Sequence, residues 1–217
     1  MKEKLFMIDI ETTGTDNQKD EILEVALVQI EFRYPFWFPT GKIYHRTLHY
    51  AGQPETPFAK QHMKALYEKC NAIDPLVNYD MVRKELQTFL HGDKPAALSL
   101  SKNIPKYFMG WNASNFDIPF MFVKNLLTAS YYETMPDGKE ELGGDVHYRI
   151  YEQTGSLQIV SDMSGLDRKT LERLAPDINP VPLPLPEGKL HDALYDCYSQ
   201  INMQNGLIQI GRKAIQK

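Results

Sequence analysis

The chain has 217 residues, of which 42% are hydrophobic and 24% charged, a composition that is ordinary for a soluble globular protein. It contains no run near the roughly 20 apolar residues of a membrane span, and its first residues do not resemble a signal peptide, so we expect a cytoplasmic protein without a membrane partner. The net charge of −4 argues against tight non-specific binding to duplex nucleic acid.

The first predicted strand, residues 5–14, carries two acidic side chains among apolar ones. Strand alternation places Asp9 and Glu11 together on one face and the residues Ile8 and Ile10 on the other. Two neighbouring carboxylates at the end of a buried strand repel each other and lose hydration, which a hard divalent cation would compensate. The alternative is that both residues only mark where the strand reaches water.

The next segments predict an antiparallel meander followed by two helices. Strands are expected at 21–32 and 42–50, joined by an aromatic turn at 34–39 that either packs on the domain or stacks on unpaired bases. Apolar residues at helical spacing predict helices at 55–70 and 74–90. These helices are expected to cover one face of the sheet.

A further acidic residue, Asp117, follows another predicted strand. That strand ends at Gly110 or Trp111, and after a polar turn a helix begins near Ser114 or Asn115 and extends to about Leu127. Asp117 therefore lies at a helix start, where it either complements the helix dipole or is held over the end of the sheet.

The last third of the chain contains a Gly-, Pro- and acid-rich loop or insertion at 133–145. Strands are predicted at 146–151 and 157–160, and a helix at 168–174. Alternating prolines at 179–188 favour an extended polyproline II connector.

The connector leads to His191 and to a C-terminal helix that we expect to extend to about Ile208. His191 and Asp196 are five residues apart, roughly 500° of helical rotation, so both cannot share a helix face. His191 must lie in the connector or at the first helical residue. Asp192 shares the face of Asp196 and is a rival ligand, although its position at the helix start favours an N-cap.

Three segments together resemble the ordered motifs of the DnaQ-like 3′-5′ exonucleases, a family that includes proofreading exonuclease subunits, RNase T and oligoribonuclease. They are residues 8–14, Asn112 with Phe116 and Asp117, and residues 191–196. A histidine five residues before the last Asp resembles the His type, DEDDh. The segments keep the family order across nearly the whole chain, which implies a single exonuclease domain over residues 1–217.

The resemblance implies an α/β, RNase H-like fold: a mixed five-stranded sheet with helices on both faces. It also implies metal-dependent hydrolysis of single-stranded DNA or RNA from the 3′ end, with release of nucleoside 5′-monophosphates. The expected partners are 3′ ends of single strands. Three states of assembly stay open: a free monomer, a homodimer, and a complex with a polymerase or nuclease partner.

The resemblance further implies a site for two ions, Mg²⁺ or Mn²⁺, which stabilise the attacking and leaving oxygens. Asp9 would bridge both ions, and Asp117 would hold the ion on the leaving side. Glu11 and Asp196 would bind the ion on the nucleophile side. His191 would act as general base, because imidazole titrates near working pH.

The turn after the first strand is expected to contact the terminal 3′ nucleotide, since a glycine allows close approach of the backbone. The expected substrate-binding residues are Thr12, Thr13, Gly14, Asn112 and Phe116. Two other functions stay open at this point. One is a two-metal phosphodiesterase acting on small nucleotides, and the other is an inactive nucleic-acid-binding adaptor of the same fold.

Overall fold

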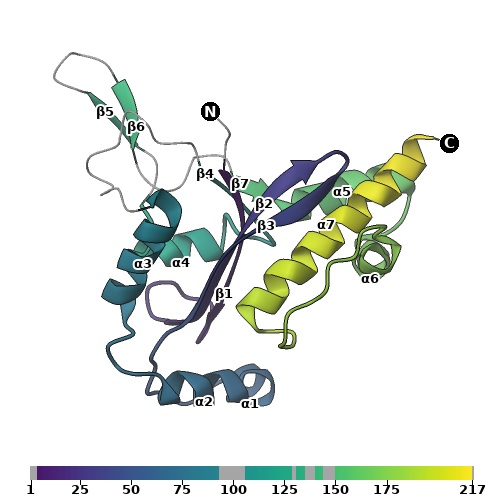
Figure 1. Cartoon of the computed structure of the whole chain (residues 1–217). Helices are drawn as coiled ribbons and strands as arrows, with labels where there is room; N and C mark the ends of the chain where they lie inside the picture. The colour runs from purple at the N-terminus through teal and green to yellow at the C-terminus, as the bar shows by residue number, and fades with distance from the viewer. Residues whose placement is uncertain (1–3, 93–105, 129–130, 135–139, 144–149, 217) are drawn as a thin grey trace.

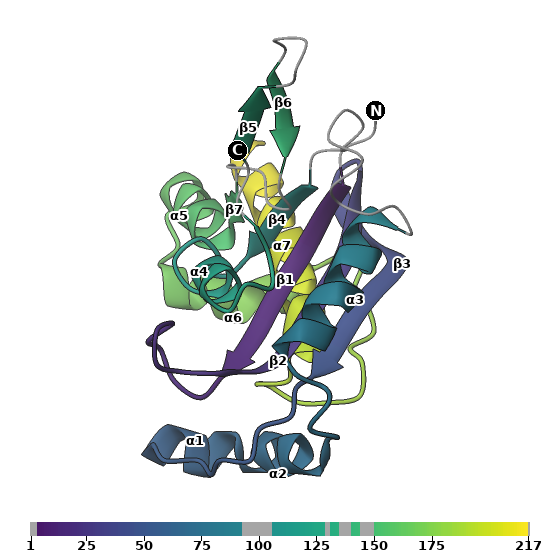
Figure 2. The same cartoon turned by 90° about the vertical axis from the view of Figure 1, so that its left-hand side faces the viewer.

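The computed structural model describes residues 4–92, 106–128, 131–134, 140–143 and 150–216, with 131–134 and 140–143 described by their backbone alone. One sheet lies between helices on its two faces (Figures 1 and 2). Its strands are β1 (Lys4–Thr12), β2 (Ile22–Arg33), β3 (Phe36–Thr47), β4 (Lys106–Gly110) and β7 (Ile150–Glu152). Their order is β3-β2-β1-β4-β7, with β1, β4 and β7 parallel and β2 antiparallel to both of its neighbours. This confirms the expected mixed five-stranded sheet.

Seven helices lie in the described part of the chain. They are α1 (Pro57–His62), α2 (Lys64–Ala72), α3 (Tyr79–His91), α4 (Asp117–Val123), α5 (Gln153–Ser164), α6 (Arg168–Ile178) and α7 (Ala193–Ile215). None of these helices is long and apolar enough to cross a membrane. Strands β5 (Tyr131–Thr134) and β6 (Glu140–Gly143) pair in a separate hairpin that projects from the main body (Figure 1).

The central strand β1 divides the core in the way its alternation predicts. Phe6 and Ile8 are fully buried on the face covered by α3 and α4. Met7 is fully buried on the opposite face, with Cys197 and Ile201 of α7. Burying a large apolar side chain contributes roughly 1.5–3 kcal/mol. The two faces of β1 therefore fix which way its acidic residues point, and they lie on the α7 side.

Residues 157–160 are helical, so the strand predicted there is wrong. Leu157 and Val160 lie on one face of α5 and pack with Leu207 and Ile210 of α7. A short apolar run suits a buried helix as well as a strand, and here the neighbouring helix decides. The fifth strand of the sheet is β7, which overlaps the end of the strand predicted at 146–151. Residues 146–149 of that prediction lie outside the described residues.

The predicted helix 55–70 is divided at Met63, and its two parts do not cover the sheet face. Ala59, Met63 and Leu66 form a small cluster with Leu23, and α1 and α2 lie below the end of the sheet (Figure 2). Only the second predicted helix, observed as α3, packs on the sheet face, through Val82 and its neighbours.

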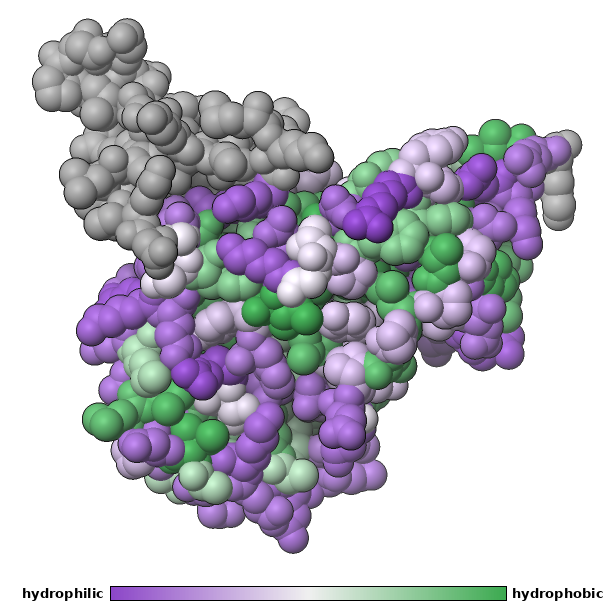
Figure 3. Space-filling model, in the orientation of Figure 1, coloured by the Kyte–Doolittle hydropathy of each residue, from purple (hydrophilic) through white to green (hydrophobic). Residues whose placement is uncertain are grey.

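The aromatic segment 34–39 is mostly strand rather than turn, because only Tyr34 and Pro35 form the turn between β2 and β3. The side chain of Trp37 packs against the α7 side of the core, and its backbone N–H donates to Oδ1 of Asn205 (2.8 Å). The packing alternative therefore holds for Trp37. Apolar and polar side chains are interspersed on the face seen in Figure 3.

Candidate active site

The residues singled out from three distant segments line one cavity of about 340 Å³. β1 contributes Asp9 and Glu11, the first residue of α4 is Asp117, and the start of α7 brings His191 and Asp196. β1 and β4 are parallel neighbours, so their carboxyl ends meet at the same edge of the sheet. The loop after β4 and the start of α7 both reach that edge. The roles of these residues remain predictions.

Asp117 is held directly onto β1. Its Oδ1 accepts a hydrogen bond from the N–H of Ile10 (2.9 Å), and the side chain is buried, with the whole residue 4% exposed. Ile10 stands between the two acidic residues of β1, so this bond brings the third carboxylate beside them. Of the two alternatives for Asp117, the structure therefore favours a carboxylate held over the end of the sheet.

Gln200, which sequence analysis did not identify, orients the first carboxylate. Its Nε2 donates to Oδ1 of Asp9 (2.7 Å), and its Oε1 accepts from the N–H of Trp111 (3.1 Å). Gln200 lies four residues after Asp196 on α7, and residues at that spacing share a helix face. That spacing was a usable signal for a polar residue at the site.

The start of α7 places the histidine outside the helix, as the spacing predicts. His191 has a left-handed backbone (φ 69°), and its N–H donates to Oδ2 of Asp196 (3.0 Å). Asp192 is the N-cap, since its side chain accepts from the N–H of Tyr195 (3.2 Å). Ligand atoms of Glu11, His191 and Asp196 all lie within 4.8 Å of one another, so these three could share a metal ion.

The carboxylates strongly perturb one another. Burial, then the charges of Asp117, Glu11 and Asp196, raise the pKa of Asp9 well above its ordinary value. Burial and the charge of Asp196 raise the pKa of Glu11 to about 8, and burial raises the pKa of Asp117 to about 8. The pKa of Asp196 rises to about 6, again mainly through burial. No lysine or arginine is among these leading influences.

Divalent cations fit this donor set. Closely spaced, desolvated carboxylates need a compensating positive charge, and hard carboxylate oxygens suit Mg²⁺ or Mn²⁺. Burial, together with the charges of His62 and Lys189, lowers the pKa of His191, which favours the neutral imidazole. A neutral imidazole can accept a proton or bind a metal.

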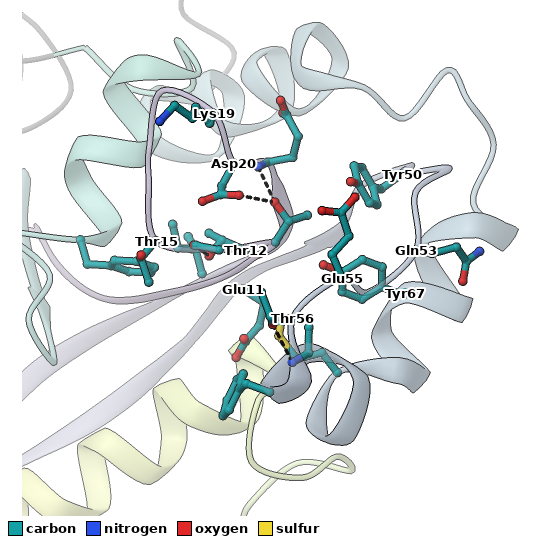
Figure 4. A pocket seen from close by; sticks show the side chains of 18 residues that line it. Glu11, Thr12, Thr15, Lys19, Asp20, Tyr50, Gln53, Glu55, Thr56 and Tyr67 are labelled. Atoms are coloured by element: carbon teal, nitrogen blue, oxygen red, sulfur yellow. Dashed lines mark hydrogen bonds between the residues drawn. The ribbon is translucent and has the colours of Figure 1, made fainter.

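A larger cleft of about 750 Å³ adjoins the cavity (Figure 4). It lies between the β1–β2 loop, which carries Lys19 and Asp20, and the segment before α1, which carries Glu55 and Thr56 (Figure 4). Glu11 and Phe116 border both spaces, and the predicted substrate residues Thr12, Thr13 and Gly14 line the cleft.

Asn112 does not reach either space, unlike the other residues predicted to bind substrate. It is exposed with a left-handed backbone (φ 59°), and its carbonyl accepts from the N–H groups of Asn115 and Phe116 (3.1 and 3.0 Å). Its side chain bonds Asn115 (3.0 Å). Asn112 therefore shapes the turn that carries Phe116 toward the site.

Asp20 holds the loop that borders the cleft. Its carboxylate accepts from the hydroxyl of Thr13 (3.2 Å) and from the N–H of Asp16 (2.8 Å). A Cβ atom at Gly14 would collide with this carboxylate. A larger residue at position 14 would therefore displace the Asp20 carboxylate from its present place.

Neither the family models nor the curated protein sequences compared with the chain match it. The whole chain aligns with E. coli exonuclease I in a zinc-bound complex with single-stranded DNA, at a TM-score of 0.60 and 13% identity, over 42% of that chain. A structure of E. coli exonuclease I with a dT13 oligonucleotide gives a TM-score of 0.48 at 10% identity, over 99% of this chain and 43% of that chain. The protein thus spans less than half of the exonuclease I chain. The first likeness shows a shared fold and confirms the expected RNase H-like α/β architecture.

Proposed function

We propose that the protein is a metal-dependent 3′-5′ exonuclease of the DnaQ-like His type, acting on single-stranded nucleic acid. The observation that supports this most is the meeting of four buried or half-buried carboxylates and one histidine in a single cavity. These residues come from three separate segments in the order that the resemblance implies. We further propose that residues 1–217 act as one exonuclease domain.

In this proposal the carboxylates of Asp9, Glu11, Asp117 and Asp196 hold two divalent cations, Mg²⁺ or Mn²⁺. When bound, such ions stabilise the charge on the attacking and leaving oxygens of a phosphodiester. His191 takes the proton from the attacking water, a role that its neutral state favours. Gln200 keeps Asp9 oriented through its hydrogen bond of 2.7 Å.

The adjoining cleft suits the sugar and base of the terminal nucleotide better than a phosphate. Apart from the proposed metal ligand Glu11, the acidic residues Asp20, Glu21 and Glu55 border it, against the charged amine of Lys19. Such a lining repels a phosphate chain but accepts a neutral base. Tyr50, which borders the same cleft, offers an aromatic surface for stacking.

The polymer is single-stranded DNA or RNA. The E. coli exonuclease I structure with the same fold holds single-stranded DNA, which supports testing DNA first. We propose release of nucleoside 5′-monophosphates. Water attacks the last phosphodiester, the 3′-oxygen of the preceding nucleotide leaves, and the phosphate stays on the 5′-oxygen of the departing nucleotide.

The decisive experiment compares the rates at which the protein cleaves a single-stranded oligonucleotide and a small phosphodiester of one nucleotide, each incubated with Mn²⁺. The exonuclease proposal predicts preferred cleavage of the oligonucleotide. Preference for the small ester would favour the small-nucleotide phosphodiesterase. Binding of the oligonucleotide without cleavage of either substrate would favour the inactive adaptor.

A further inference from the structure

Behind the candidate site lies another buried carboxylate, Glu24 of β2, which is 0% exposed. It stands directly opposite Glu11 in the antiparallel register of β1 and β2. Like charges placed opposite each other in a sheet are destabilising. A buried acid beside the acidic site therefore needs a reason, and its hydrogen bonds supply one.

One carboxylate oxygen of Glu24 accepts a hydrogen bond from the start of α7. Oε2 accepts from the N–H of Ala193 (3.0 Å), and both groups are buried. Ala193 is the first residue of α7, and the first N–H groups of a helix have no partner within the helix. A carboxylate at this end also interacts favourably with the helix dipole. The bond spans 169 positions of sequence and fixes α7 to β2.

The other oxygen of Glu24 accepts two side-chain hydrogen bonds and lies beside a histidine. Oε1 accepts from the hydroxyl of Thr47 (2.7 Å) and from Nζ of Lys69 (2.6 Å), and Nε2 of His45 lies 3.1 Å away. Burial alone would raise the pKa of Glu24, but its contacts with His45, Lys69 and Thr47 lower it to about 2. Glu24 is therefore a charged group whose position is determined by β3 and α2.

Ala193 stands between the two site residues that α7 brings. His191 precedes it by two residues, and Asp196 follows it by three, within the first turn. Moving this turn would move both residues relative to Asp9 and Glu11, which are fixed to β1. Glu24 also accepts from Lys69 of α2, the helix whose Tyr67 lines the larger cleft. Glu24 therefore links α2 to the start of α7.

We propose that Glu24 is a positioning residue, which anchors the first turn of α7 so that His191 and Asp196 face the acidic pair of β1. This rests on the proposed exonuclease function. Glu24 itself does not line the cavity, and its charge is already matched by Lys69, so its role is to hold the helix.

The test compares Glu24→Ala and Glu24→Gln with a matched control, Glu85→Gln. Glu85 is likewise a carboxylate bound by β3, through Tyr44 and Arg46, but it lies on α3 away from the cavity. Circular dichroism and thermal melting identify the folded variants. Amide exchange of Ala193 and steady-state kinetics are then measured on the full chain.

Glu24→Ala is expected to speed exchange of the Ala193 amide by about tenfold or more, as for losing one hydrogen bond to a charged acceptor. It should lower kcat by about tenfold while KM changes less than about twofold, since the defect lies in the placement of reacting groups. Glu24→Gln keeps an acceptor and should recover part of both losses. Glu85→Gln should leave both unchanged.

A folded Glu24→Ala variant with the exchange and kcat of the control would overturn the proposal. If Glu24→Ala does not fold, unchanged Ala193 exchange and kcat in Glu24→Gln would do the same. The exchange readout needs no substrate, which separates the two hypotheses. An unaltered protein that cleaves nothing refutes the proposed function, whereas unchanged Ala193 exchange refutes the anchoring.

Discussion

Replacing Glu11 by glutamine is expected to stabilise the metal-free protein at pH 8, although Glu11 is a proposed metal ligand. Burial and the neighbouring carboxylates raise the pKa of Glu11 from 4.5 to about 8. One pKa unit corresponds to about 1.36 kcal/mol, so an ionised Glu11 lowers the free energy of unfolding by at most ~5 kcal/mol. Because the carboxylates of the cluster share protons, we expect ~1–3 kcal/mol at this position.

The pKa of Glu11 is higher in the folded than in the unfolded chain, so the folded chain binds more protons between these two values. The contribution of protonated Glu11 to the free energy of unfolding is therefore fully present below pH 4.5 and is lost as the pH rises toward about 8. Glutamine does not ionise and avoids this loss. In thermal melts with a chelator, the variant should match the unaltered protein at pH 4 and exceed its Tm by roughly 2–10 °C at pH 8.

Adding Mn²⁺ at pH 8 should reverse the order, because a cation that binds the folded state stabilises it and the variant lacks one ligand. The control is Glu85→Gln. Arg46 and Tyr44 hold the pKa of Glu85 below its usual value, so its loss should destabilise the protein at pH 8. A Glu11→Gln variant that is no more stable than the unaltered protein in chelator at pH 8, or that gains as much stability from Mn²⁺, would refute this role of Glu11.

Three further predictions concern single contacts. Gln200→Leu removes the hydrogen bond that lowers the pKa of Asp9, so the pH–rate profile should move to higher pH, with kcat reduced about tenfold at pH 7. Gly206→Ala would drive a Cβ atom into the backbone of α6 and should lower the free energy of unfolding, measured by urea denaturation, by ~1–3 kcal/mol or more. Gly155→Ala on α5 is the control, because its Cβ atom would meet nothing within 4 Å, and it should raise that free energy by up to ~1 kcal/mol. Asp192→Ala should cost ~1 kcal/mol through loss of the N-cap, and Asp192→Asn should restore most of it; equal urea midpoints for the two variants would contradict the capping role.

Much of the site could be predicted because its residues follow local rules. Strand alternation alone places Asp9 and Glu11 on one face, and the spacing of His191 and Asp196 excludes a shared helix face. These rules depend only on neighbours in sequence. The structure agrees with each of them, since His191 lies just outside α7 and Asp196 within its first turn.

What could not be predicted depends on partners distant in sequence. The sequence around Glu24 does not indicate its partners, because Lys69 and Ala193 reach it only in the folded chain. The run 157–160 has the composition of a strand, but in the fold its apolar residues pack as one helix face against Leu207 and Ile210 of α7. Gln200 is the exception, because its spacing from the last acidic residue of the site was visible.

The proposed exonuclease activity is tested directly by a time course on 5′-labelled single-stranded DNA and RNA of the same sequence, with Mg²⁺ or Mn²⁺. The unaltered protein is compared with Asp9→Asn and His191→Ala. A 3′-5′ exonuclease should give a ladder that shortens from the 3′ end, disappears in Asp9→Asn and weakens strongly in His191→Ala. The strand that is shortened faster identifies the polymer. No ladder on either strand, or a ladder that persists in Asp9→Asn, would contradict the proposed activity.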